Sequence, residues 1–164
     1  MDDKIKSPGP GIFARAYGRF VTAATYLQCP LLLIIRLYWG WQFFLAGKGK
    51  LSHLDKTTDF FQSIHIPLPH LNAVFVSLSE CIGGILLMMG LGTRAVAALL
   101  AADMIVAFLT ADIESVKHIW NDSDKFVSAA PFLFLLACSI LVAFGPGKIS
   151  LDGLIIRLRR NGPT

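Results

Sequence analysis

The chain has 164 residues, of which 54% are hydrophobic and only 16% are charged, and its mean hydropathy is +0.60. This composition is too apolar for a soluble domain of this size and is typical of an integral membrane protein. The net charge of +4 does not indicate nucleic-acid binding, because the basic residues are divided between chain ends and loops and form no stripe interleaved with aromatic residues.

The first segment, residues 1–27, is predicted to lie on the cytoplasmic side of the membrane. Residues 1–11 form a polar tail rich in proline and glycine, which we expect to be mobile. Residues 12–27 carry apolar side chains at helical spacing, with Arg15 and Arg19 on the opposite side. This pattern predicts an amphipathic helix in the membrane interface, whose simplest role is to anchor the first span.

Four apolar stretches follow, each in the length range of a membrane-spanning helix. They are residues 28–46, 71–91, 95–111 and 126–144. Pro30 fits the first turn of the first span, and the three-residue link Gly92-Thr93-Arg94 predicts a tight antiparallel hairpin between the second and third. The sequence therefore predicts an all-α four-helix membrane bundle over residues 28–155, followed by a basic cytoplasmic tail over residues 156–164.

The distribution of basic residues predicts the orientation. Nine Lys and Arg residues lie in the N-terminal arm, the hairpin link and the tail, against five in the other two connections. Because the cytoplasmic side carries the excess, both termini are predicted to be cytoplasmic, in a bacterial-type plasma (inner) membrane. All four histidines then lie on the outer side, where they are expected to be solvated loop residues: His53, His65, His70 and His118.

Three ionisable side chains lie inside the predicted spans: Arg36, Glu80 and Asp103. A charge in hydrocarbon costs at least ~2.5 kcal/mol, so each needs a partner, a proton or a water-filled cavity. Counted from the cytoplasmic ends of their spans, the three lie within a slab about 5 Å thick, so we expect them to meet. An ion pair that only locks the helices and a functional site are both open interpretations.

Each of these residues lies beside small residues that allow close helix packing. The faces expected to pack together are Arg36, Gly40, Phe43 and Gly47; Ser77, Glu80 and Gly84; and Ala95, Ala98 and Ala102 beside Asp103.

Aromatic and polar residues cluster at positions 38–44, just beyond Arg36. Much of this cluster fits a lipid-facing belt, but it also suits a flat apolar ligand with carbonyl groups, such as a quinone. On this hypothesis Glu80 carries the proton, Arg36 tunes it and donates to a carbonyl, and Asp103 holds Arg36. The ligand contacts are then Trp39, Gln42, Phe43 and Ser77.

No motif in the chain encodes a cofactor or a metal site. Cys29, Cys81 and Cys138 form no C-x-x-C pair, and Cys29 lies near the cytoplasmic end. Cys81 and Cys138 lie at similar depth, where a buried pair is open and buried inert thiols are the expected use. Because nothing in the chain supplies electrons, a redox role requires a flavin or iron–sulfur partner.

Several short motifs carry a resemblance to a known family. They are Arg36-Leu37, Gly40, Phe44, Gly47, Lys50-Leu51, Ile66-Pro67, Glu80, Gly83-Gly84, Leu91-Gly92-Thr93-Arg94, Gly145-Pro146-Gly147-Lys148 and Ser150-Leu151-Asp152. Over residues 30–155 the chain resembles the DoxX family of small four-span membrane proteins, which is similar to the DoxD-type subunit of a thiosulfate:quinone oxidoreductase. The resemblance implies a membrane-embedded redox subunit or a quinone-handling protein.

Two alternatives stay open. A non-catalytic scaffold or assembly subunit would keep the charges for packing and hold a partner through its loops or tail. A small proton-coupled transporter would use Glu80 and Asp103 as a relay, although the chain shows no evident broken helix or inverted repeat. Association with further copies of the chain is also left open.

Overall fold

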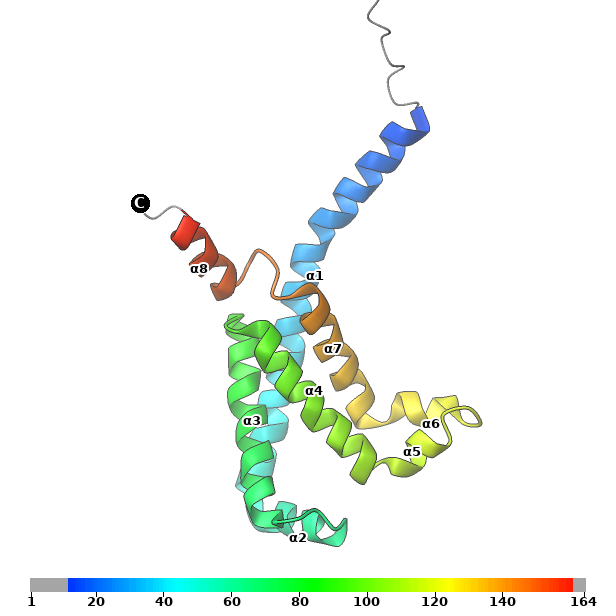
Figure 1. The fold of residues 1–164 in the computed structure, drawn as a ribbon, viewed down its shortest axis with the longest axis vertical. Helices are drawn as coiled ribbons and strands as arrows, with labels where there is room; N and C mark the ends of the chain where they lie inside the picture. The colour runs from blue at the N-terminus through cyan, green and yellow to red at the C-terminus, as the bar shows by residue number, and fades with distance from the viewer. Residues whose placement is uncertain (1–11, 161–164) are drawn as a thin grey trace, which may run out of the picture.

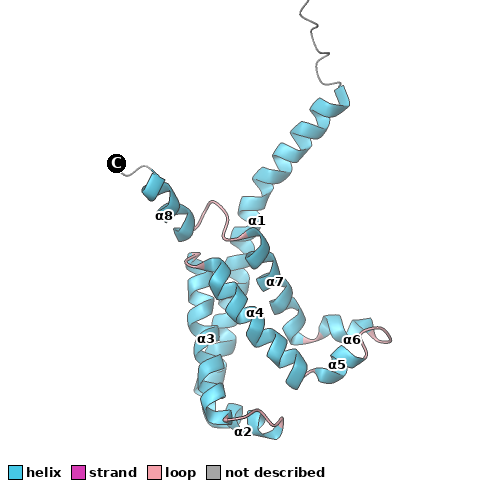
Figure 2. Cartoon of the chain, in the orientation of Figure 1, coloured by secondary structure: helices cyan, strands magenta, loops and turns pink. Residues whose placement is uncertain are grey.

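The computed structural model describes residues 12–160, and within this range the chain consists of helices and their connections (Figures 1 and 2). In chain order the helices are α1 (Ile12–Ser52), α2 (Leu54–Ser63), α3 (Pro69–Met89), α4 (Thr93–Thr110), α5 (Ile113–Lys117), α6 (Ser123–Ser128), α7 (Ala130–Phe144) and α8 (Leu151–Arg160). By length and composition, α1, α3 and α4 can cross a membrane, and α7 is a shorter apolar helix. The predicted all-α membrane bundle is confirmed, while the tail predicted to be mobile, residues 1–11, lies outside the described residues.

Helix α1 is continuous over 41 residues, which corresponds to about 60 Å. The predicted interfacial helix, residues 12–27, and the predicted first span, residues 28–46, are therefore parts of one helix. Pro30 lies inside the helix and removes only one backbone hydrogen bond, in a part of the helix that is mostly exposed. The helix also continues past Ala46 to Ser52, so Lys50 belongs to α1 and not to a polar connection.

The fourth apolar stretch is divided into two helices. The predicted span starts at Phe126, but Ala129 is extended and α7 begins only at Ala130, with Pro131 in its first turn. Proline is well placed there because an N–H group at this position, which proline lacks, would have no partner inside the helix. The remaining 15 residues of α7 measure about 22 Å, shorter than a typical hydrocarbon core.

The helices pack as two main pairs, α1 with α3 and α4 with α7. A tight hairpin joins α3 to α4, as predicted, and the two helices diverge from it (Figure 1). Gly90 and Gly92 in this hairpin have φ angles of 71° and 59°, a left-handed conformation that a side chain would strain. The divergence leaves space between α3 and α4 at the end of the bundle near α2.

The contact between α1 and α3 follows two stripes of buried residues. They are Arg36, Gly40, Phe43 and Gly47 on α1, and Ala73, Ser77, Glu80, Gly84 and Leu87 on α3. Both stripes alternate steps of four and three residues, the spacing of a helix–helix seam. The faces predicted for these two helices are therefore buried as expected.

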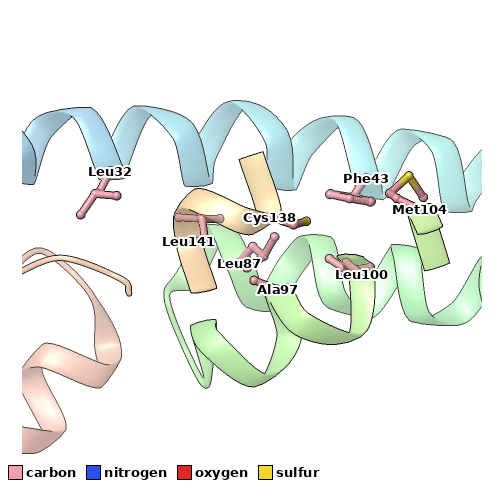
Figure 3. Packing of buried hydrophobic residues seen from close by; sticks show 8 residues of the cluster. All are labelled: Leu32, Phe43, Leu87, Ala97, Leu100, Met104, Cys138 and Leu141. Atoms are coloured by element: carbon pink, nitrogen blue, oxygen red, sulfur yellow. The ribbon is translucent and has the colours of Figure 1, made fainter. Parts of the chain in front are cut away.

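The small-residue face predicted for the third span is wrong. Ala95, Ala98 and Ala102 are exposed, and α4 instead buries Ala97, Leu100, Met104 and Phe108. A central cluster brings Leu100 and Ala97 together with Phe43 of α1, Leu87 of α3, and Cys138 and Leu141 of α7 (Figure 3). The predicted alanine face therefore lies on the exposed side of α4, together with Leu99, Ile105, Val106 and Leu109.

The α1–α3 seam depends on glycine at Gly84. A Cβ there would lie 2.5 Å from the Gly40 carbonyl oxygen and 2.7 Å from the Phe44 nitrogen, and backbone atoms of a packed helix move little. We expect Gly84→Ala to lower the free energy of unfolding in detergent by about 1–3 kcal/mol. Gly49→Ala is the matched control, because a Cβ at Gly49 meets nothing within 4 Å. Equal thermal stabilities of the two variants would contradict the close packing.

Candidate functional site

A cavity of about 580 Å³ lies among α2, α3, α4 and the end of α1. Its walls are mainly apolar and include Phe61, Ile64 and Ile66 near α2, with Met104 and Val106 on α4. The polar or charged residues that reach it are Lys50, Lys56, Thr57, His65, Asn72, Glu80, Asp103 and Thr110. Because Val106 is 51% exposed and belongs to a spanning helix, the cavity is bordered by a lipid-facing surface.

Glu80 is the most deeply buried ionisable group of this cavity, with 1% of its surface exposed. Its Oε1 accepts a hydrogen bond from Lys50 Nζ at 2.5 Å. Among the described residues, its Oε2 has no hydrogen-bond partner. A carboxylate removed from water is costly unless its oxygens are bonded. Glu80 therefore lines the cavity with one carboxylate oxygen left without a hydrogen bond.

Lys50 reaches Glu80 because of how the two helices are aligned. Gly40 contacts Gly84, and Gly47 contacts the backbone of Ser77 and Cys81, so α1 and α3 run antiparallel. This alignment brings Lys50 within about one helical turn of Glu80. The lysine side chain is one-third exposed, so its ammonium group borders both the buried carboxylate and the open part of the cavity.

Asp103 supplies the second carboxylate of the cavity. Its Oδ2 accepts a hydrogen bond from Ser79 Oγ at 2.6 Å, which connects α4 to α3. Asp103 also lines the cavity beside Lys50 and Glu80. Lys50, Glu80 and Asp103 therefore form a cluster of charged residues in the lining of a mainly apolar cavity.

Arg36 is not part of this cluster, so the predicted layer of three charges is wrong. Its guanidinium group donates to the carbonyl oxygens of Pro146, at 2.8 Å, and Ile149, at 2.7 Å. It lies against Gly90, ten residues beyond Glu80 and thus about 15 Å farther along α3. Counting from the predicted span ends fails because Gln28 does not lie level with Leu91: the glycine contacts of α1 with α3 place Arg36 itself beside the hairpin.

The four predicted ligand contacts lie outside the lining of this cavity. Trp39 and Phe43 pack edge-to-face on Phe134 of α7, with ring centroids 5.0 and 4.7 Å apart. Ser77 donates to the Ala73 carbonyl oxygen at 2.6 Å, and Gln42 is partly buried. Trp39, Phe43 and Ser77 thus contribute to packing within and between the helices.

Sequence reasoning missed Lys50, His65 and Asn72 as cavity residues. For Lys50 a signal exists, because residue 50 continues the four-and-three spacing of Arg36, Gly40, Phe43 and Gly47. His65 has a φ angle of 62° and lies in the connection after α2, whose path no periodicity reveals.

The end of the bundle at the hairpin is fastened by a set of contacts that we call the latch: Arg36, Gly90, Gly92, Thr93, Pro146, Ile149 and Asp152. The Asp152 carboxylate accepts hydrogen bonds from the backbone N–H groups of Gly92, at 2.8 Å, and Thr93, at 3.0 Å. The Asp152 N–H donates to the Gly90 carbonyl oxygen at 3.0 Å. These bonds hold the α7–α8 connection against the α3–α4 hairpin. Most of the motifs at residues 90–94 and 145–152 therefore have a structural role.

In the connection between α4 and α7, Glu114 pairs with two neighbouring residues. Lys117 donates to Glu114 at 2.8 Å, and this bond lowers the pKa of the exposed Glu114 carboxyl group. His118 lies 3.7 Å from Glu114. Within residues 12–160 no group of three or more His, Cys, Asp or Glu residues is placed to hold a metal ion.

Comparison with known proteins gives the family. The DoxX family model matches residues 31–113. The chain belongs to the DoxX family. This DoxX protein is 32% identical over 132 residues to "Putative oxidoreductase CatD" of Bacillus subtilis (strain 168), which covers 79% of this chain and 90% of the relative.

A second relative of this DoxX protein is "Inner membrane protein YphA" of Escherichia coli (strain K12). The two are 32% identical over 129 residues, which covers 74% of this chain and 88% of the relative. No solved structure shows significant similarity. Family membership and the apolar helices together identify this DoxX protein as a membrane protein.

Proposed function

We propose that this DoxX protein is the membrane subunit of a quinone-linked oxidoreductase and binds a quinone in the cavity beside Glu80. The observation that carries the proposal is a buried carboxylate with an unbonded oxygen in a cavity of mainly apolar walls. The name of the CatD relative, an oxidoreductase, supports the reaction class.

The cavity suits a quinone in size, wall chemistry and access. Its volume falls in the range of about 300–1,000 Å³ that is common for small-molecule sites. Phe60 and Phe61 provide aromatic walls, against which a flat ring packs well. The border at Val106 allows an isoprenoid tail to remain in the bilayer while the ring reaches the charged cluster.

The residues of the cluster have separate expected roles. A bound quinone supplies the redox chemistry, in which reduction to the quinol consumes two electrons and two protons. Lys50 Nζ donates a hydrogen bond to a ring oxygen, and Glu80 Oε2 and Asp103 exchange protons with ring oxygens. His65, which is exposed at the cavity edge, connects these carboxyl groups with water. The electrons come from a partner that carries a flavin or an iron–sulfur cluster.

The orientation proposed with this function has both termini in the cytoplasm of a bacterial-type plasma membrane. The positive-inside count supports it, and one relative is named an inner membrane protein. Glu80 then lies near the middle of α3, and the cavity opens toward the outer half of the bilayer.

The proposal is tested by filling the cavity without changing its charge. Ala107 lines the cavity, so we expect Ala107→Phe to displace the ring. Ala98→Phe is the matched control, because Ala98 lies on the same helix, is exposed, and is not among the lining residues. The purified variants are incubated with a short-chain ubiquinone, and retained quinone is measured by mass spectrometry of an organic extract.

Wild type and Ala98→Phe should retain the quinone, whereas Ala107→Phe and Glu80→Gln should retain at least about tenfold less, the equivalent of ~1.4 kcal/mol. Equal retention by all four proteins would contradict the proposal. Absence of quinone from all of them, together with poor folding of Glu80→Gln, would favour a scaffold that keeps the ion pair only for packing.

A further inference from the structure

A second cavity, of about 930 Å³, lies at the latch end of the molecule, between α1, the start of α4 and α8. It is lined by three cationic side chains, Arg94, Lys148 and Arg157, and by apolar ones that include Leu32, Ile155 and Ile156. We call these residues the basic groove. Figure 1 shows α8 beside the α3–α4 hairpin, with the middle of α1 across from it.

The positive charge of the basic groove is not neutralised within the described part of the chain. None of its three cations forms an ion pair there. Asp152 is the acidic residue that lines the groove, and its two carboxylate oxygens are already bonded to the N–H groups of Gly92 and Thr93. The groove therefore has an excess of positive charge suited to an anionic group.

Two features hold the groove in shape. Arg94 lies across the end of α7, where it donates a long hydrogen bond of 3.4 Å to the Ala143 carbonyl oxygen. Gly145, with a φ angle of 75°, leaves room for it, because a Cβ there would lie 3.2 Å from Arg94 Nε. The first turn of α8 is fixed by the bonds of Asp152 to the hairpin. The backbone that carries Lys148 and the start of α8 is thus attached to the hairpin.

The position of the groove along the bundle indicates the kind of anion. The groove lies where α3 and α7 end and α4 begins, which is the boundary of the apolar spans. On α8, Leu151, Leu154 and Leu158 lie at the three- and four-residue spacing of one helix face and are 39%, 50% and 64% exposed. Such a helix is suited to lie in the membrane interface, where its apolar side chains contact lipid.

We propose that the basic groove binds the phosphate headgroup of an anionic phospholipid, with an acyl chain along Leu32, Ile155 and Ile156. Positive side chains at a membrane surface attract anionic lipids, and here they surround a cavity that also has an apolar wall. The basic groove and the cavity at Glu80 lie at opposite ends of the α1–α3 contact and share no lining residue. The test of lipid binding therefore does not depend on quinone binding.

The test measures lipids retained by the full chain in native mass spectrometry. The detergent-purified protein receives equal amounts of phosphatidylglycerol and phosphatidylcholine. The test variant is the double substitution Lys148→Gln/Arg157→Gln, because neither side chain forms an ion pair in the described structure. Lys117→Gln/Lys125→Gln is the charge-matched control in the connection between α4 and α7, and Lys148→Arg/Arg157→Lys retains the charges of the groove.

Wild type, the control and the charge-retaining variant should bind phosphatidylglycerol in preference to phosphatidylcholine. The test variant should lose at least about tenfold of this binding, since each basic residue contributes roughly fivefold. Equal binding of the two lipids by wild type, or equal losses in the test variant and the control, would overturn the proposal. Displacement of the lipid by millimolar inorganic phosphate would also overturn it, because the groove would then be a site for free phosphate.

Discussion

Lys50→Met is expected to lower the free energy of unfolding by about 3–5 kcal/mol, the typical cost of breaking a buried ion pair from one side. Glu80 is 1% exposed, and Lys50 makes the one hydrogen bond to its carboxylate within the described residues. Methionine preserves most of the side-chain length but leaves the charge of Glu80 without a partner. Thermal or denaturant unfolding in detergent, followed by circular dichroism, measures the loss.

Two further variants distinguish the ion pair from simple packing. Lys48→Met is the matched control, because Lys48 lies on the same helix, is exposed and makes no ion pair in the described structure. The double variant Lys50→Met/Glu80→Gln should recover most of the lost stability, since no unpaired charge remains. A double variant as unstable as Lys50→Met would contradict the assigned pairing.

Arg36→Met is expected to lower the free energy of unfolding by about 3–6 kcal/mol, because two hydrogen bonds from a charged donor are lost at ~1.5–3 kcal/mol each. The carbonyl oxygens of Pro146 and Ile149 lose this donor when the guanidinium group is removed. Since these bonds hold the α7–α8 connection, the latch should open. Trypsin should then cleave faster after the exposed Lys148, and the unfolding temperature should be lower.

The controls for Arg36 separate the latch from general effects of charge. Arg19→Met removes an exposed arginine from the same helix and should leave the cleavage rate unchanged. Arg36→Lys should recover only part of the stability, because one ammonium group cannot reproduce the forked geometry of a guanidinium group. Cleavage rates that are equal in wild type and Arg36→Met would contradict a role in the latch.

The helical class, the hairpin and the packing faces of α1 and α3 follow from the sequence. Gly40 and Gly47 on one helix, and Ser77 and Gly84 on the other, lie at the spacing of a helix seam, and both sets are buried. Small residues in a seam are a local signal, because close approach of two backbones excludes larger side chains. This signal does not identify which position on one helix lies level with a position on the other.

Register and helix length are the properties that local pattern does not determine, and the site depends on both. Lys50 is the last residue of two consecutive glycine–lysine pairs, residues 47–50, that read as a loop, yet the helix continues because Gly47 packs directly on α3. The extra turn and a half brings a lysine to Glu80 and leaves Arg36 at the latch. The partner of Glu80 was therefore predicted wrongly, although Glu80 itself was correctly singled out as a buried charge.

Hydrophobicity also does not distinguish a core from a lipid-facing surface. On α4 the buried Ala97 and the exposed Ala98 are neighbours of the same type, and lipid accepts both. In the aromatic cluster, Phe43 is fully buried while Trp41 is 49% exposed. Assigning such residues requires the positions of the neighbouring helices, here Phe134 on α7.

The most direct test of the proposed site is photo-crosslinking with an azido-quinone, followed by peptide mapping of the full-length protein in lipid nanodiscs. Binding at Glu80 predicts labels on the cavity residues of α2 and α4, within residues 56–67 and 103–111, that are competed by unlabelled quinone. Labels confined to residues 38–44 and α7, or labels spread over the lipid-facing surface without competition, would contradict a quinone site in this cavity.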